Sequence, residues 1–273
     1  MTTAQPGFHG LDIFGLDLHF AGGGRGSGFA GAAWRGLLGQ ALCAAVCPYP
    51  TPACAACPTV GSCAYPDLFK PVDAARLPPF WLHDWQRGRE GWRVGLRWVG
   101  DKSLALGEWL AALAQDAPHL SFSGTRARLT HAISAADSSL TWQAGSGWRT
   151  PLRPLVLLPS SQPPRTCRIA FRAPLVSKHG GDPLYGALHT RLQRLVALYG
   201  DGCELPRSDL PWDCRVLDRK ERRIPLAKRM LSGIEWQLEL TAIDPAAWSL
   251  LQAGAELHAG GQTGMGCGRY ALV

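Results

Sequence analysis

The sequence lacks a long hydrophobic run. No apolar stretch approaches the roughly 20 residues that a membrane helix needs, and residues 1–6 lack a charged start followed by an apolar core. The chain is therefore expected to be cytoplasmic, with no membrane partner. Its nine cysteines are an odd number, and in a reducing compartment we expect thiols or metal ligands rather than a disulfide framework.

Lysine is scarce as well, since 23 of the 28 basic residues are arginine. Arginine offers a planar fork to phosphate oxygens and stacks on bases better than lysine does. A GC-rich genome accounts for the number of arginines but not for their clustering. The 273 residues, 46% of them apolar, exclude a mainly disordered chain and suit one large domain or two ordinary ones.

Two segments rich in small residues mark the organisation. The glycine segment 22–28 lacks the Gly-Lys-Ser/Thr ending of a nucleotide-binding loop, so ATP binding is not expected. Segment 159–164 combines prolines with small polar residues and predicts a linker. The predicted domains are residues 1–158 and 165–273.

Hydrophobic periodicity predicts the elements of each half. In the first half we expect strands at 11–20, with a slip near Gly15, at 92–99 and at 121–132, and helices at 29–46 and 104–115. In the second half we expect strands at 167–175, 212–217, 234–243, 256–258 and 269–273, and helices at 184–199 and 245–253. The order indicates an α+β fold of two tandem ferredoxin-like β-α-β-β-α-β domains. The first carries a cysteine-rich insert, and the second a basic finger at 215–231 and a glycine-rich loop at 260–268.

The basic finger is the main charged feature. Its seven cations are Arg215, Arg219, Lys220, Arg222, Arg223, Lys228 and Arg229. Only Asp218 and Glu221 oppose them, so residues 215–229 are net +5 (7 − 2) in a chain of net +7. Most charge runs are only solvated faces, but the interleaved apolar residues predict a packed hairpin or helical finger that binds a polyanion.

The chain ends in a second candidate binding element, a glycine-rich loop. Its members are Gly260, Gly261, Gly264, Gly266, Gly268 and the neighbouring Arg269. Bare backbone there can approach phosphates without side chains in the way.

Five cysteines lie within 21 residues with the spacing C-x3-C-x6-C-x2-C-x5-C. They are Cys43, Cys47, Cys54, Cys57 and Cys63. The spacing is compatible with a structural tetrahedral zinc site, while the prolines between the cysteines also fit a rigid turn with reduced thiols. Both readings stay open. The eleven tryptophans are expected mainly in the core.

The motifs together resemble a known family. The basic finger, the segment 233–236, the pair Leu250-Leu251 and the glycine-rich loop are similar to the C-terminal half of the CRISPR-associated repeat-cleaving endoribonucleases of the RAMP superfamily. Trp34-Arg35-Gly36, the cysteine cluster and the segment 63–69 resemble the N-terminal half of that family. The likeness spans most of the chain, with residues 81–149 matching only in outline.

The resemblance implies a protein that binds the stem-loop of a CRISPR repeat RNA, cuts once at its 3′ base and stays on the mature crRNA. Such a protein joins other CRISPR effector subunits. The family needs no cofactor for cleavage: the ribose 2′-hydroxyl attacks the adjacent phosphate and leaves a 2′,3′-cyclic phosphate. This chemistry needs in-line positioning, a proton acceptor and cations over the developing charge.

The catalytic residues depart from the family pattern, because residues 21–46 contain no His, Lys or Tyr. Arg25 and Arg35 remain there to hold the scissile phosphate, since arginine cannot act as a normal base. His179, beside Lys178 in a glycine-flanked loop, is the candidate for proton transfer. An arginine-based site resembles the form found with type IV systems.

Two rival interpretations remain. One is a catalytically inactive RNA-binding scaffold subunit of a CRISPR effector complex, which the missing histidine favours. The other is a zinc-containing RNA-binding module unrelated to CRISPR.

Overall fold

The computed structural model describes residues 10–24, 29–49, 54–69, 77–100, 103–115, 120–157, 162–177, 183–202, 204–205, 207–226 and 229–273. The chain divides into two compact units. The N-terminal unit is Asp12–Val156, and the C-terminal unit is Leu157–Val273 together with the chain up to Leu11. No helix in these described ranges combines the length and the apolar character needed to span a bilayer.

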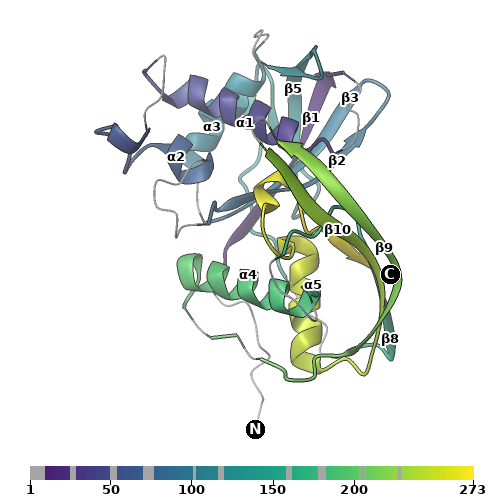
Figure 1. Ribbon diagram of the computed structural model, residues 1–273. Helices are drawn as coiled ribbons and strands as arrows, with labels where there is room; N and C mark the ends of the chain where they lie inside the picture. The colour runs from purple at the N-terminus through teal and green to yellow at the C-terminus, as the bar shows by residue number, and fades with distance from the viewer. Residues whose placement is uncertain are drawn as a thin grey trace. The chain divides into compact units, whose positions relative to one another are not determined.

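The N-terminal unit is built on one antiparallel sheet (Figure 1). Its elements are β1 (Ile13–Gly22), α1 (Gly31–Val46), η1 (Cys54–Ala56), α2 (Ala64–Phe69), β2 (Phe80–Arg87), β3 (Gly91–Val99), α3 (Ser103–Leu113), β4 (Ser121–Phe122), β5 (Thr125–Ser134), β6 (Leu140–Gln143) and β7 (Gly147–Trp148). The strand order is β2-β3-β1-β5-β6-β7, with β4 paired to β5. Its first four strands follow the ferredoxin-like order, in which the first and third strands are central.

Alternation along β1 explains why this sheet has one apolar face. Leu16, Leu18 and Phe20 are buried in a core that α1 and α3 complete, the former with Trp34 and the latter with Trp109. Side chains alternate across a strand, so the residues between these apolar ones lie on the opposite face, which we call the outer face of the N-terminal sheet.

The C-terminal unit repeats the plan in its simplest form. Its elements are β8 (Thr166–Phe171), α4 (Pro183–Tyr199), β9 (Asp213–Leu226), β10 (Arg229–Thr241), α5 (Pro245–Leu257), η2 (Thr263–Met265) and β11 (Tyr270–Leu272). The sheet order is β11-β8-β10-β9, all antiparallel. The predicted tandem ferredoxin-like fold is therefore confirmed, and the edge strand β9 carries most of the predicted finger.

Four local predictions were wrong. Strand β2 was missed, because its sequence mixes three aromatic residues with charges. Segment 256–258 belongs mostly to α5, which runs to Leu257 rather than ending at 253. The irregularity of β1 lies between His19 and Phe20, opposite β5, rather than near Gly15. The basic finger, which was expected as an insertion in the second domain, is β9 itself and the start of β10.

Helix α4 shows how packing overrides patterning. Leu184, Leu188, Leu192 and Leu195 form the expected buried stripe. Arg191, which the pattern placed off this face, is only 5% exposed and donates from Nε to the carbonyl oxygen of Leu257 at 2.7 Å. Burial lowers its pKa to about 9. This arginine satisfies a carbonyl in the last turn of α5, a position that favours a cation.

Helix α5 begins with a side-chain cap whose removal should be measurable. The Asp244 carboxylate accepts from the backbone N–H of Ala246 at 2.9 Å and of Ala247 at 3.1 Å. We expect Asp244→Ala to lower the free energy of unfolding by about 1 kcal/mol, measured by urea denaturation. Asp244→Ser keeps an acceptor in place and should lose much less; equal losses in the two variants would argue against the cap.

Candidate nucleic-acid interface

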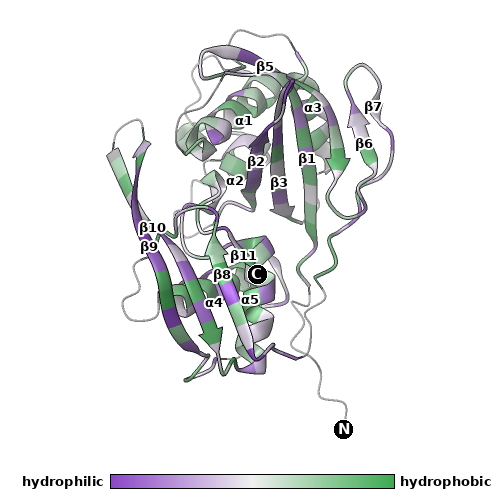
Figure 2. Cartoon of the chain, turned by 90° about the vertical axis from the view of Figure 1, so that its right-hand side faces the viewer, coloured by the Kyte–Doolittle hydropathy of each residue, from purple (hydrophilic) through white to green (hydrophobic). Residues whose placement is uncertain are grey.

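The basic residues lie on a long two-stranded hairpin. Pairing of β9 with β10 sets Arg219 opposite Trp236 and Arg223 opposite Ser232 on one face, and Arg222 opposite Gly233 on the other. A strand rises about 3.3 Å per residue, so Arg215 and Arg223 are separated by roughly 26 Å along the hairpin. Figure 2 shows the hydrophilic stretch of β9 between more apolar ends. The charges therefore follow a line long enough to meet several phosphates.

Pairing also brings carboxylates to the arginines. Residues 213–241 hold seven basic and five acidic side chains, a net charge of +2 (7 − 5). Two acids come from β10: Glu235 binds Arg222 at 2.9 Å, and Glu239 binds Arg215 at 3.1 Å. The net +5 of residues 215–229 therefore overstates the charge of the folded hairpin.

Acids of β9 itself hold two more cations. Lys220 contacts Asp218 at 3.0 Å, and this hydrogen bond lowers the pKa of the Asp218 carboxyl. Arg219 contacts Glu221 at 2.8 Å. Exposed pairs of this kind are worth little energetically, so they can exchange for phosphate contacts at small cost.

Arg223 differs from its neighbours. It is exposed, and within the described part of the chain no carboxylate forms an ion pair with it. It lines a pocket of about 560 Å³ that also includes Arg222, Ser232 and Trp236. The volume falls within the range of ligand pockets.

The pocket has an aromatic component. The Trp236 ring is half-buried, and the guanidinium carbon of Arg219 lies 5.5 Å from its centre. Among the described residues no acceptor reaches its Nε1. A half-buried indole beside arginines suits a nucleobase with its phosphate. The sequence analysis expected the tryptophans in the core. Only the strand register, which sets Trp236 opposite Arg219, distinguishes Trp236 from the core tryptophans.

The connection after β8 closes the same pocket. Leu175 pairs with Ile234 through two backbone hydrogen bonds of 2.8 and 3.0 Å, and Leu175 and Ser177 line the pocket. Lys178 and His179 follow Ser177 directly in sequence but lie outside the described residues, as do Lys228, Arg25 and the side chain of Arg229.

The glycine-rich loop is fastened to this connection. Gly261 N–H donates to Val176 at 2.8 Å and Gly268 N–H to Pro174 at 2.9 Å, while Gly266 N–H donates within the loop to Thr263 at 2.7 Å. Gly268 has φ +74°, and a Cβ there would lie 1.8 Å from the Ala259 oxygen.

These contacts give the glycines of the loop a structural role in the fold. Gly260 N–H also has an acceptor, the Ala187 oxygen at 3.4 Å, and Gly264 is half-buried. Arg269 uses its carbonyl oxygen to accept from Arg172 at 2.9 Å. The amides of Gly260, Gly261, Gly266 and Gly268 are thus not free donors for phosphate, although the loop brings the basic hairpin and the terminal glycines to a shared backbone segment.

Arg35 holds two helices together. It lies in α1, and its Nη2 donates to the carbonyl oxygen of Phe69 at the end of α2, at 2.6 Å. Its guanidinium carbon lies 5.3 Å from the Phe69 ring centre and 5.6 Å from that of Phe80, and burial lowers its pKa. Packing and a satisfied helix-end carbonyl explain this arginine without a substrate.

The five clustered cysteines do not form a metal centre in the described structure. Cys43 and Cys47 lie at the end of α1, Cys54 opens η1, and Cys57 and Cys63 lie in the loop before α2. Across the described ranges, no three His, Cys, Asp or Glu side chains are placed to hold a metal ion.

The thiols make local contacts instead. Cys57 Sγ lies 3.2 Å from Thr59 Oγ1, and the pKa of Cys43 is raised by burial and by the neighbouring thiol of Cys47. The pKa of Cys43 is also raised by Cys54 and Cys63, and a structural zinc at these cysteines stays a prediction.

Comparison with known proteins fits this architecture. A family model described as the AF_1859_N N-terminal domain matches residues 17–91, and a search of curated proteins finds no match. Among solved structures, a Cas6 (TTHB231) product complex aligns over 96% of this chain and 99% of its own, with a TM-score of 0.56 at 16% identity. The chain has the Cas6 fold.

Two further structures support the same fold. Thermus thermophilus Cas6 (TTHB231) has a TM-score of 0.52 at 14% identity, over 96% of this chain and 99% of its own. A partial Cas6-RT-Cas1–Cas2 complex contains a chain with a TM-score of 0.57 at 12% identity, which covers 97% of this chain and 46% of that one. The Cas6 fold is thus shared by chains whose sequences have diverged widely, and the type IV form remains a prediction.

Proposed function

We propose that this protein binds the stem-loop of a CRISPR repeat RNA through the β9–β10 hairpin, cuts the RNA at the 3′ base of the stem and remains on the mature crRNA. The observation that carries the proposal is the pocket of Arg222, Arg223 and Trp236 on a Cas6 fold. One structure of this fold is a product complex, and another is of a RAMP protein binding different RNA substrates, with a TM-score of 0.50 at 10% identity over 95% of this chain.

The hairpin suits a folded RNA better than a small metabolite. Its cations lie along an extended line, and A-form RNA offers its phosphates and loops more readily than its base edges. Arg223 can contact a phosphate directly, and Trp236 can stack on an unpaired base beside it. Product retention follows if these contacts are to the stem that survives the cut, and other effector subunits can then assemble on the crRNA.

Cleavage would use the RNA's own 2′-hydroxyl and no metal cofactor. The hydroxyl attacks the adjacent phosphorus, the bond to the 5′ oxygen of the next nucleotide breaks, and a 2′,3′-cyclic phosphate and a 5′-hydroxyl remain. His179 is our candidate for accepting and returning the proton, because it lies two residues after Ser177 of the pocket. Lys178 and Arg25 would stabilise charge on the phosphate, whereas Arg35 is assigned to folding.

A second candidate is an RNA-binding scaffold that does not cut. One observation favours it: α1 contains no histidine, and its arginine is bonded to the carbonyl oxygen of Phe69. The scaffold would keep the hairpin contacts and the effector partners but lack turnover.

One cleavage experiment separates the two. Purified protein is incubated in EDTA with repeat RNA, and in parallel with the same RNA carrying a 2′-deoxyribose at the scissile position. The enzyme cuts only the first RNA, with about one cut per protein if product stays bound. Binding of both RNAs without any product would establish the scaffold, and cutting of both RNAs would exclude attack by the 2′-hydroxyl.

A further inference from the structure

Two histidines from distant parts of the sequence stack on the outer face of the N-terminal sheet. His19 on β1 is paired with His131 on β5, and their ring centres are 4.3 Å apart with planes 11° from parallel. Both are half-buried. They line a pocket of about 470 Å³, together with Phe20, Thr130 and residues of the β2–β3 hairpin. All of its lining residues belong to the N-terminal unit.

The hydrogen bonds of Thr130 fix the state of one imidazole. Its hydroxyl donates its single proton to the carbonyl oxygen of His19, at 2.9 Å. Toward His131 Nδ1, at 3.0 Å, the same oxygen can therefore only accept. Neutral His131 thus carries its proton on Nδ1 and keeps Nε2 as a basic nitrogen.

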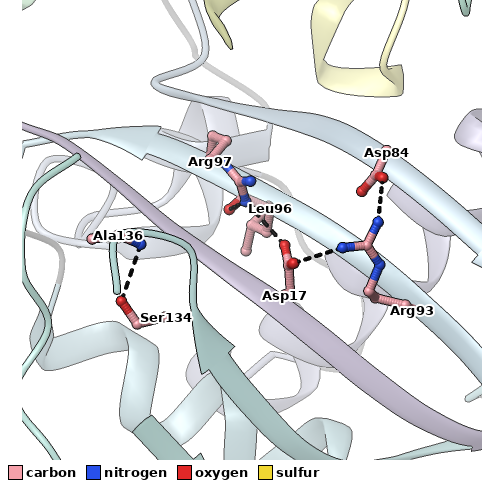
Figure 3. Close-up of polar contacts among 7 residues, drawn as sticks. All are labelled: Asp17, Asp84, Arg93, Leu96, Arg97, Ser134 and Ala136. Atoms are coloured by element: carbon pink, nitrogen blue, oxygen red, sulfur yellow. Dashed lines mark hydrogen bonds and ion pairs between the residues drawn. The ribbon is translucent and has the colours of Figure 1, made fainter. Parts of the chain in front are cut away.

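The arginines around the pocket have their charge largely engaged. Arg93 bridges Asp17 at 2.9 Å and Asp84 at 2.7 Å, as Figure 3 shows. Arg87 donates to the carbonyl oxygens of Gly23 and Gly24 and lies over the Trp92 ring.

The remaining charged groups near His19 and His131 add little net charge to the pocket. On the β2–β3 turn, Glu90 lines the pocket beside Arg89, which offsets the charge. On β5, Arg128 is opposite Ala21, and from the β6–β7 side Arg149 binds Gln143, the pairing partner of His131. The two imidazoles are therefore the groups that can add positive charge to the pocket.

Burial and mutual repulsion keep the imidazoles neutral when the pocket is empty. The pKa of His19 is lowered, first by burial and then by His131, with Asp17 opposing and Arg93 adding to the effect. The pKa of His131 is lowered by burial. An anion beside the rings would favour the protonated form instead.

We propose that the His19–His131 pocket is a binding site for the phosphate group of a nucleotide, and that it takes up one proton as the ligand binds. The volume suits a nucleotide. The proposal does not rest on RNA processing by the C-terminal unit. Its linkage has a definite sign: affinity rises as pH falls, by about tenfold per pH unit above the pKa of the pair.

The test uses the full chain and the dinucleotide UpU, whose phosphodiester keeps one charge across the pH range. We expect the dissociation constant at pH 6.0 to be about 30-fold lower than at pH 7.5 at constant ionic strength. Histidine NMR signals of His19 or His131 should titrate at higher pH with UpU present. His131→Gln and His19→Gln should abolish the pH dependence, while His83→Gln on β2, outside the pocket lining, should keep it.

The wild-type titration decides the matter even if a variant fails to fold. Inorganic phosphate is run as a second ligand: a response to both ligands indicates a site for RNA backbone, and a response to phosphate alone indicates a site for free phosphate. If neither ligand shifts the histidine signals at pH 6.0, the proposal is overturned. Normal binding of repeat RNA beside histidine signals that neither UpU nor phosphate shifts would overturn it while leaving the proposed function intact.

Discussion

Replacing Arg219, Arg222 and Arg223 with alanine is expected to weaken binding of a repeat stem-loop RNA by about 100-fold at low salt. The estimate takes roughly 1 kcal/mol for each lost phosphate contact, about 3 kcal/mol in all. The dependence of log K on log salt should become shallower by about two, since each phosphate contributes roughly 0.7 to 0.9 to the slope. Filter binding between 50 and 300 mM salt measures both quantities.

A matched control separates the hairpin from net charge. Arg165, Arg194 and Arg207 are exposed residues of the same unit that lie off the hairpin. Changing these three to alanine alters the formal charge equally, from +7 to +4, yet should leave affinity nearly unchanged. Equal losses of RNA affinity in the two triple variants would show that the affinity depends on net charge and not on the hairpin.

The control also addresses a simpler explanation of the arginines. β9 is the edge strand of its sheet, and charged side chains on an edge strand prevent pairing with other chains. If that is their only role, the hairpin triple variant should self-associate while binding RNA as tightly as the wild type. Size-exclusion chromatography beside the binding assay distinguishes these outcomes.

Trp34→Ala should give the largest loss of stability, about 3–5 kcal/mol in the free energy of unfolding. Trp34 is fully buried, and its ring centre lies 4.5 Å from that of Phe122, 5.0 Å from Phe20 and 5.7 Å from Trp92. Truncation leaves a cavity among three aromatic rings, which cannot collapse to fill it. Urea denaturation followed by circular dichroism measures the loss.

Trp34→Phe provides the comparison. Among the described residues nothing accepts from the Trp34 Nε1, so this variant loses ring volume but also removes an unpaired buried donor. We expect it to lose less than half as much as alanine. A loss below 1 kcal/mol for Trp34→Ala would show that the N-terminal core is not packed around this ring.

Sequence periodicity predicted the tandem ferredoxin-like plan, because most of its strands and helices show a clear apolar pattern, although β2 does not and was missed. It also located the cationic segment, but it could not supply the strand register. That register sets Glu235 and Glu239 against the arginines and Trp236 opposite Arg219. The predicted charge was therefore too high, and the aromatic part of the pocket was missed.

The surroundings of the other functional candidates also depend on contacts between distant segments, which the sequence does not reveal. Alternation in β1 puts His19 on the outer face, but only the pairing of β1 with β5 brings it to His131, 112 residues later. Arg35 was predicted to hold phosphate because residues 21–46 contain no His, Lys or Tyr, and only the position of α2 reveals its acceptor, the Phe69 oxygen. Contacts between distant segments decided each of these cases.

Crosslinking tests the central claim most directly. Repeat stem-loop RNA containing 4-thiouridine is irradiated in complex with the full chain, and the attached peptides are identified by mass spectrometry. The account predicts that the main crosslinks fall between Asp213 and Thr241, with Trp236 among them, and that they are lost in the hairpin triple variant. Strong crosslinks found only elsewhere in the chain, unchanged in that variant, would contradict it.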